Sequence, residues 1–173
     1  TFYSFQYEDF ESLKNKLEKV LKLLEKFSFI TTSEAKSDNP FRKASEVKQD
    51  IELRPTIIGK RVSELYIDPV TANYIIESLK KLQGVTPFSL LHVMCRCLEA
   101  KPLLSTKKKD MEYIEEILSY HSSFLVDKIP NEWDIEYDDY IDSIKTASFF
   151  QSWAEEFGED KILESFGVTP GEL

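Results

Sequence analysis

The chain has 173 residues, of which 42% are hydrophobic, so it is long enough for one domain with a substantial core or for two small domains. Its net charge is −9, and its apolar runs are far shorter than the roughly 18 residues of a membrane-spanning helix, which argues against a membrane protein. No signal-peptide pattern opens the sequence, and we therefore expect a soluble cytoplasmic protein.

Charge is distributed unevenly along the chain. Residues 1–109 carry 19 basic and 14 acidic side chains, whereas residues 110–173 carry 3 basic and 17 acidic ones. Because nucleic-acid phosphates are attracted by lysine and arginine and repelled by carboxylates, any nucleic-acid contact is expected before residue 110. The acidic part also has a simpler explanation, since an acidic surface keeps a protein soluble.

The first predicted element is a helix from Glu8 to Phe27. Its apolar residues recur at the helical period and form one stripe, which consists of Leu13, Leu17, Val20, Leu21, Leu24 and Phe27. The opposite face carries Lys19, Lys22 and Lys26. Most such faces are simply solvated, but this one is the first candidate for phosphate contact.

Two short strands, FSFITTS and IELRPT, are predicted next because they are rich in strand-forming residues. The segment between them, residues 34–50, is polar, turn-rich and too long for a tight hairpin. A helix followed by a two-stranded hairpin with a basic tip matches the second half of a winged helix. In that arrangement four further basic residues would join the lysine face: Arg42, Lys43, Lys48 and Arg54.

The stretch IIGKR resembles part of a phosphate-binding loop, but two requirements of that loop are missing. The glycine expected five residues before Gly59 is replaced by Arg54, and the hydroxyl that would hold Mg²⁺ is replaced by Arg61. We therefore expect no ATP site in this chain. A short helix that begins at Thr56 or Gly59 and reaches Tyr66 is predicted instead.

Five further helices are predicted after this point, with no strand among them. Asp68-Pro69 and Thr86-Pro87 each supply an N-cap followed by proline at the first helical position. The expected ranges are 69–82, 87–98, about 107–120, about 138–157 and 159–166. The chain is thus predicted to be mainly α, with residues 1–67 forming the end of a winged helix and residues 68–173 a helical bundle. Trp153 and Tyr66 are expected to be mostly buried, Tyr66 at the junction of the two domains.

Catalytic and metal-binding patterns are weak. Structural or capping roles are favoured for His92 and His121, and Cys95 and Cys97 are expected to be reduced thiols rather than a disulfide or half a metal site. The carboxylate run EWDIEYDDYID lacks the glycine turn and the ligand spacing of a calcium loop. We therefore predict no catalytic, metal-binding or cofactor-binding residue in this chain.

Two stretches carry a resemblance to a known family. ELRPTIIGKRVSELYIDPVTANYIIESL resembles the end of the winged-helix domain and the start of the next domain in archaeal Hjm-type DNA-repair helicases of superfamily 2. The metazoan relatives of these enzymes are HELQ and the helicase part of polymerase theta. DSIKTASFFQSWAEEFGEDKILESFGVTPGEL is similar to the same family further on, and the resemblance extends from about Leu13 to Leu173.

The resemblance implies that the parent protein is an ATP-dependent 3′-to-5′ DNA helicase of DNA repair or replication restart. Two motor domains upstream of Thr1 would bind ATP and Mg²⁺, and forked or single-stranded DNA would be the partner. This chain would be a fragment that holds part of the winged helix and the start of a helical ratchet domain. It would position duplex DNA and brace the ring around the translocated strand.

Two features qualify this expectation. Residues 34–50 form a longer segment than the wing of the family, and the turn that matches Pro170 to Leu173 precedes the family's DNA-contacting helix. Thr169-Pro170 itself has the pattern of a helix start, which indicates a truncated domain. The alternative reading of the residues is a protein-interaction module, a winged helix plus an acidic bundle, with no direct DNA contact.

Overall fold

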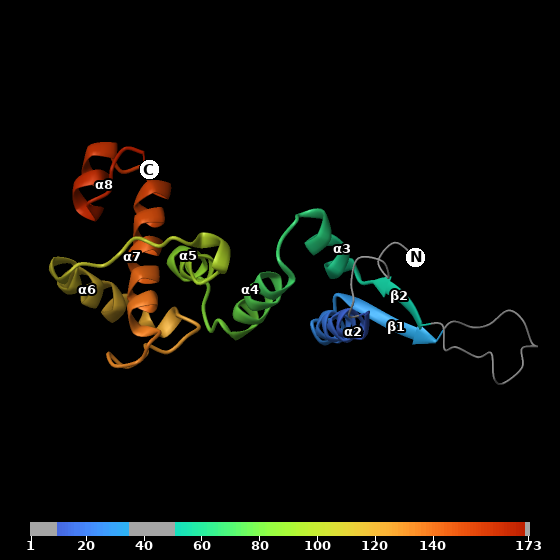
Figure 1. Ribbon diagram of the computed structural model, residues 1–173. Helices are drawn as coiled ribbons and strands as arrows, with labels where there is room; N and C mark the ends of the chain where they lie inside the picture. The colour runs from blue at the N-terminus through green and yellow to red at the C-terminus, as the bar shows by residue number, and fades with distance from the viewer. Residues whose placement is uncertain (1–9, 35–50, 172–173) are drawn as a thin grey trace, which may run out of the picture. The chain divides into compact units, whose positions relative to one another are not determined.

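The computed structural model of the chain describes residues 10–34 and 51–171 (Figure 1). Its described backbone is mainly helical, with one two-stranded antiparallel sheet, which confirms the predicted fold class. The backbone divides into two compact units, one ending at residue 72 and one beginning at residue 73. None of the described helices is long and apolar enough to cross a membrane.

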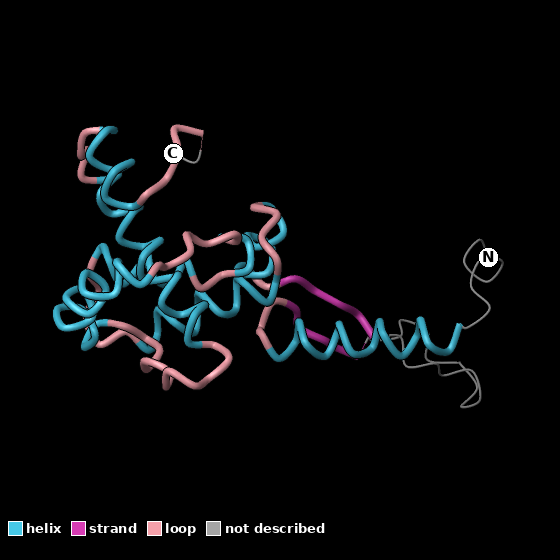
Figure 2. The backbone as a smooth tube through the Cα atoms, turned by 60° about the vertical axis from the view of Figure 1, so that its left-hand side comes forward, coloured by secondary structure: helices cyan, strands magenta, loops and turns pink. Residues whose placement is uncertain are grey.

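The first unit contains helix α2 (Phe10–Lys26), strands β1 (Ile30–Glu34) and β2 (Ile51–Pro55), and helix α3 (Ile57–Glu64). Figure 2 shows the two strands running beside α2. The strands are antiparallel, in a register that extends from Ile30 opposite Pro55 to Glu34 opposite Ile51, so the predicted hairpin is confirmed. Residues 35–50, which connect the strands, lie outside the described residues.

Helix α3 begins at an N-cap threonine that also ties it to the hairpin. The hydroxyl of Thr56 accepts a hydrogen bond from the Gly59 amide at 3.0 Å and donates one to the Ser28 carbonyl at 2.8 Å. A Cβ at Gly59 would lie 1.9 Å from the carbonyl oxygen of Phe29. The glycine of IIGKR is therefore needed for close packing of the helix against the backbone, and it lies in the short helix that was predicted here.

Helix α4 (Pro69–Lys81) spans the boundary between the two units, and the second unit continues with α5 (Pro87–Cys95), α6 (Met111–His121), α7 (Tyr137–Ala154) and α8 (Glu159–Phe166). The predicted caps are confirmed. A carboxylate oxygen of Asp68 accepts the Val70 amide at 2.8 Å, and Thr86 forms a reciprocal capping box with Ser89. Helix α5 ends three residues earlier than predicted, and a 3₁₀ turn at Lys108–Asp110 precedes α6.

The core of the second unit is built around α7, which packs against α5, α6 and α8 (Figure 1). Its largest cluster of buried residues comprises Phe88, Cys95, Ile114, Tyr140, Ile141, Ile144 and Ala147. A smaller cluster joins the end of α7 to α8 through Phe149, Ile162 and Phe166. Residues 140–149 of α7 are buried except for Asp142, so this helix lies at the centre of the unit's core.

Two burial predictions are wrong. Trp153 is 60% exposed because it lies in the last turn of α7, beyond the buried stretch that ends at Phe149. Tyr66 is 97% exposed and follows the C-cap of α3 in a left-handed conformation with φ of 54°. The apolar stripe of α2 is likewise covered only in part, since Leu17 and Val20 are more than half exposed.

Candidate nucleic-acid interface

The lysine face of α2 consists of Lys19, Lys22 and Lys26, and all three side chains are exposed. Their spacing of three and four residues places them on one side of the helix, opposite the apolar stripe. Within residues 10–34 and 51–171, none of the three forms an ion pair. Their ammonium groups are therefore open to an anionic partner.

Arg54 lies apart from this lysine face. Its guanidinium binds the carboxylate of Glu52 through two hydrogen bonds of 3.1 Å, so much of its charge is already offset. Arg54 pairs with Thr31 across the hairpin, whereas the neighbouring Thr32 hydrogen-bonds to Glu25 of α2. Since successive side chains of a strand point to opposite faces, Arg54 lies on the face away from α2.

The other predicted contacts, Arg42, Lys43 and Lys48, lie outside the described residues. Of the predicted contact residues that the structure describes, only the lysine face of α2 remains as a candidate interface in the first unit. The basic residues of α3 add little to it, because Lys60 and Arg61 both pair with Glu64, with nitrogen–oxygen distances of 3.8 and 2.9 Å.

A second basic element, absent from the sequence prediction, is the lysine turn: Lys107, Lys108 and Lys109, just before α6. All three side chains are exposed, and none has a carboxylate partner in the described part of the chain. The sequence carries this element as the run TKKKD.

The backbone around the lysine turn is fixed by one face of α7. The Leu104 amide donates to the Thr146 hydroxyl at 2.9 Å, and the Thr106 amide donates to a carboxylate oxygen of Asp142 at 2.6 Å. Lys145 Nζ donates to the Ser105 carbonyl at 2.9 Å. These α7 residues are three and four positions apart, so they share one side of the helix.

The same lysine forms a buried ion pair. Lys145 Nζ lies 2.8 Å from Asp110 Oδ2, and the two side chains are only 5% and 10% exposed. Burial raises the pKa of Asp110, but the hydrogen bonds from Lys145 and from the Lys107 amide outweigh it, so the pKa falls below its ordinary value. Asp110 therefore stays ionised at neutral pH, and among the described residues its ion pair is with Lys145.

The histidines and cysteines have structural environments. Burial, followed by the charge of Arg96, lowers the pKa of His92 to about 4, so its ring is neutral at pH 7 beside the Ser143 hydroxyl at 3.1 Å. His121 stacks on Phe88, with ring centroids 4.3 Å apart. Both cysteines are buried free thiols. Among the described residues, no group of three or more His, Cys, Asp or Glu side chains could hold a metal ion.

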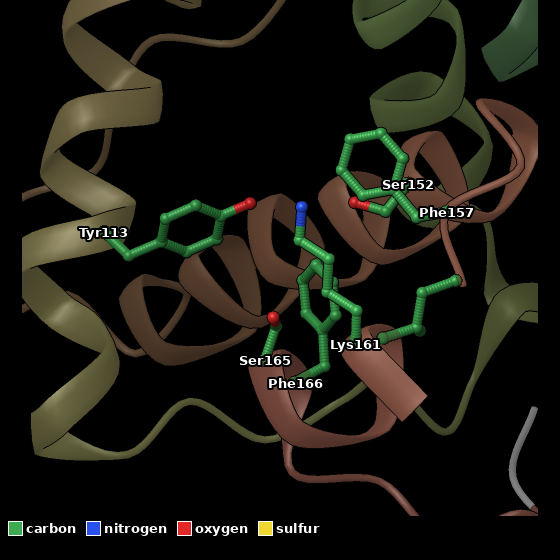
Figure 3. A pocket seen from close by; sticks show the side chains of 7 residues that line it. Tyr113, Ser152, Phe157, Lys161, Ser165 and Phe166 are labelled. Carbon is green, nitrogen blue, oxygen red and sulfur yellow. The ribbon is translucent and has the colours of Figure 1, made fainter. Parts of the chain in front are cut away.

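A small cavity of about 220 Å³ lies beside α6, α7 and α8. It is lined by Tyr113, Ser152, Phe157, Lys161, Ile162, Ser165 and Phe166 (Figure 3). Lys161 Nζ lies 4.5 Å from the ring centroid of Phe157, a cation–π contact that engages its charge. The cavity is below the size of about 300–1,000 Å³ that small-molecule sites usually have, so it is a weak candidate for a nucleotide site.

The chain resembles archaeal DNA helicases of known sequence. Residues 88–173 match the family model of archaeal helicase domain 4. The ATP-dependent DNA helicase Hel308 of Methanococcus vannielii is 30% identical over 202 aligned residues, which cover 100% of this chain and 25% of the relative. The chain is similar to an archaeal Hel308 helicase along its whole length, and the match to domain 4 lies within its second unit. The resemblance predicted from the sequence is confirmed at this level, while the relation to HELQ and polymerase theta stays a prediction.

Two other Hel308 helicases show how much of the family the chain represents. The protein of Methanocella arvoryzae is 32% identical over 126 residues, or 70% of this chain and 17% of the relative. That of Methanocaldococcus jannaschii is 29% identical over 175 residues, or 100% of this chain and 12% of the relative. The chain thus spans a quarter or less of these Hel308 relatives. The domain 4 match includes the lysine turn and leaves out α2.

Proposed function

We propose that this chain is an accessory region of an ATP-dependent 3′-to-5′ DNA helicase that acts in DNA repair or replication restart. The observation that carries the proposal is the similarity of the whole chain to proteins named ATP-dependent DNA helicases, together with the domain 4 match. ATP and Mg²⁺ would be bound by motor domains elsewhere in the parent polypeptide, in the cytoplasm. Residues 1–67 would be the end of a winged helix and residues 68–173 part of a ratchet-type domain.

The parent activity is tested with the full-length protein on two partial duplexes that differ only in the polarity of the single-stranded tail. We expect DNA-stimulated ATP hydrolysis, and unwinding of the 3′-tailed substrate but not of the 5′-tailed one. A protein that unwinds neither substrate, although it is folded and binds ATP, would contradict the helicase assignment.

Within this enzyme, the lysine face of α2 would position duplex DNA. Three exposed ammonium groups on one helix side, with no ion pair to a described residue, can contact phosphates without reading bases, so binding through them is indifferent to sequence and falls with salt. Each duplex phosphate contact contributes about 0.9 to the slope of log affinity against log salt. Replacing Lys19, Lys22 and Lys26 by glutamine should therefore flatten the slope by roughly two to three, using the same value.

This role is measured with the full-length helicase on a forked substrate. The control variant replaces Lys60 and Arg61 by glutamine, because both already pair with Glu64 and their loss should change the slope little. If the α2 variant keeps the parental slope, its lysine face is only solvated and the duplex-positioning role is wrong.

A second candidate, a protein-interaction surface, is supported by the loop before α7. Trp133 is 94% exposed and Ile135 is 100% exposed, and the flanking residues are acidic. The loop has a defined turn, because the Asn131 amide and side chain both donate to Asp134 Oδ2, at 2.9 and 3.1 Å. Exposed tryptophan is typical of protein contact sites, and the acids would select a basic partner.

Salt dependence separates the two candidates. Only DNA binding through phosphates predicts a steep loss of DNA affinity with salt that shrinks when lysines are removed. Trp133→Ser should leave that slope unchanged. If the parental protein shows no salt-dependent DNA binding, the interaction module becomes the better explanation of this chain.

A further inference from the structure

We propose that the lysine turn, Lys107 to Lys109, is a phosphate-contact site that holds the backbone of a DNA strand against the second unit. The inference rests on the proposed helicase function and adds to it a contact in the second unit. Its ligand is the phosphodiester backbone, recognised by charge rather than by base sequence.

The first support is that these three adjacent lysines form no ion pair with any described residue, whereas half of the ten basic residues of the second unit have a partner. The partnered residues contact a nearby acid or ring: Lys80 binds Glu77, Arg96 and Lys101 bind Asp139, Lys145 binds Asp110, and Lys161 lies over Phe157. The lysine turn instead places three adjacent charges in water, with no ion pair to any described residue.

The second support is that the Asp110 carboxylate is bound by Lys145. This carboxylate follows the three lysines directly and would be their natural counter-ion. Its Oδ2 atom is instead held by Lys145 Nζ at 2.8 Å and by the Lys107 amide at 2.9 Å. The lysine turn also lies at the start of α6, where the helix dipole offers a cation no compensation. Lys109 acts on the Asp110 carboxylate only at a distance, and no ion pair with a described residue offsets the three lysines, so an anion from outside would add that offset.

The third support is the rigid attachment of the turn. Asp142, Lys145 and Thr146 bind three successive backbone groups of residues 104–106. An exposed charge run that served only solubility would need no such attachment. A backbone held this firmly presents its lysines at a fixed place, so less ordering is needed when a phosphate binds.

The test uses the full-length helicase with Lys107, Lys108 and Lys109 all replaced by glutamine. The matched control replaces three dispersed, exposed lysines of the same unit, Lys81, Lys128 and Lys161, and so removes the same charge. Binding of labelled single-stranded and duplex DNA of mixed sequence is measured across a range of salt concentrations. A variant in which the three turn lysines become arginines keeps the charge and checks that the turn tolerates substitution.

Each single-strand phosphate contact is worth about 0.7 in the log–log salt slope, so the glutamine variant should flatten the single-strand slope by about two, or the duplex slope by nearly three at about 0.9 per contact. The dispersed control and the arginine variant should keep the parental slope. The DNA whose slope changes is the strand form that the site holds.

Equal slopes for the glutamine variant and the dispersed control would overturn the proposal, because net charge alone would then account for the effect. An unchanged slope on both DNAs would overturn it as well. Failure of the proposed function looks different, because the parental helicase would then bind neither DNA in a salt-dependent way.

Discussion

Replacing Lys145 by methionine tests whether the buried ion pair holds the loop against α7. Methionine keeps most of the length of the lysine stem and removes the charge. The change leaves the carboxylate of Asp110, only 10% exposed, with the Lys107 amide as its remaining partner, and it removes the hydrogen bond to the Ser105 carbonyl. Removing one member of a buried pair typically costs about 3–5 kcal/mol, and we expect a loss of unfolding free energy in that range.

A double-mutant cycle separates this effect from general damage. Lys145→Met, Asp110→Asn and the double variant are compared by denaturant unfolding followed by circular dichroism. The double variant should be less destabilised than the sum of the single variants, since neither charge is then left unpaired. Additive single effects, or a loss below about 1 kcal/mol for Lys145→Met, would refute the argument that the pair is buried and coupled.

The same pair predicts a direction for the pH dependence of stability. Because the pKa of Asp110 is lowered in the folded chain, its contribution is present above the unfolded-state pKa of about 3.9 and is lost as pH falls through the folded value. The difference in unfolding free energy between the parent protein and Asp110→Asn should therefore become smaller as the pH is lowered below about 4. A difference that stays constant down to the acid transition would contradict this reasoning.

Three further predictions concern single positions. Gly59→Ala should lower stability by about 1–3 kcal/mol, because the new Cβ would meet the Phe29 carbonyl at 1.9 Å, whereas Gly158→Ala, with nothing within 4 Å, should be close to neutral in thermal unfolding. Because the pKa of His92 is lowered to about 4, the neutral ring is favoured on folding, and its contribution to stability should be lost between about pH 6.5 and 4. NMR titration of the His92 ring would contradict this if its midpoint were near 6.5. The chain by itself should not hydrolyse ATP, and phosphate release that persists through purification and disappears in Lys60→Ala would show otherwise.

Local chemistry made the helices predictable. Thr56, Asp68 and Thr86 each satisfy the free amides of a first helical turn with their own side chains, and this signal lies within three residues of sequence. The bounds of α8 follow from the glycines beside it. Gly158 precedes its first residue, and Gly167 ends it in a left-handed conformation. Where a boundary was missed, as at the end of α5 and the start of α6, a 3₁₀ turn continued or preceded the helix and left little trace in the hydrophobic pattern.

Burial was harder to predict because it depends on which neighbours cover a helix face. Trp153 is large and aromatic, which favours burial. Nothing in the sequence of α7 shows that the part of the helix packed against its neighbours ends near Phe149. The exposure of the lysine face of α2, in contrast, could be predicted from helical spacing alone, because it does not depend on which other elements pack nearby.

The lysine turn lies within residues 1–109, the part of the chain in which charge balance predicted nucleic-acid contacts, but its lysines were not among the predicted contact residues. Counting placed the boundary between basic and acidic parts at residue 110, and so treated Asp110 as the first of the acids. In the structure this carboxylate is neutralised by Lys145, 35 residues away, and it belongs to the interior rather than to the surface. The electrostatic potential at the surface depends on which charges are neutralised in buried ion pairs. Those pairs join residues that are far apart in the sequence. An acidic domain can therefore present a basic site to a nucleic acid when its nearest carboxylate faces inward.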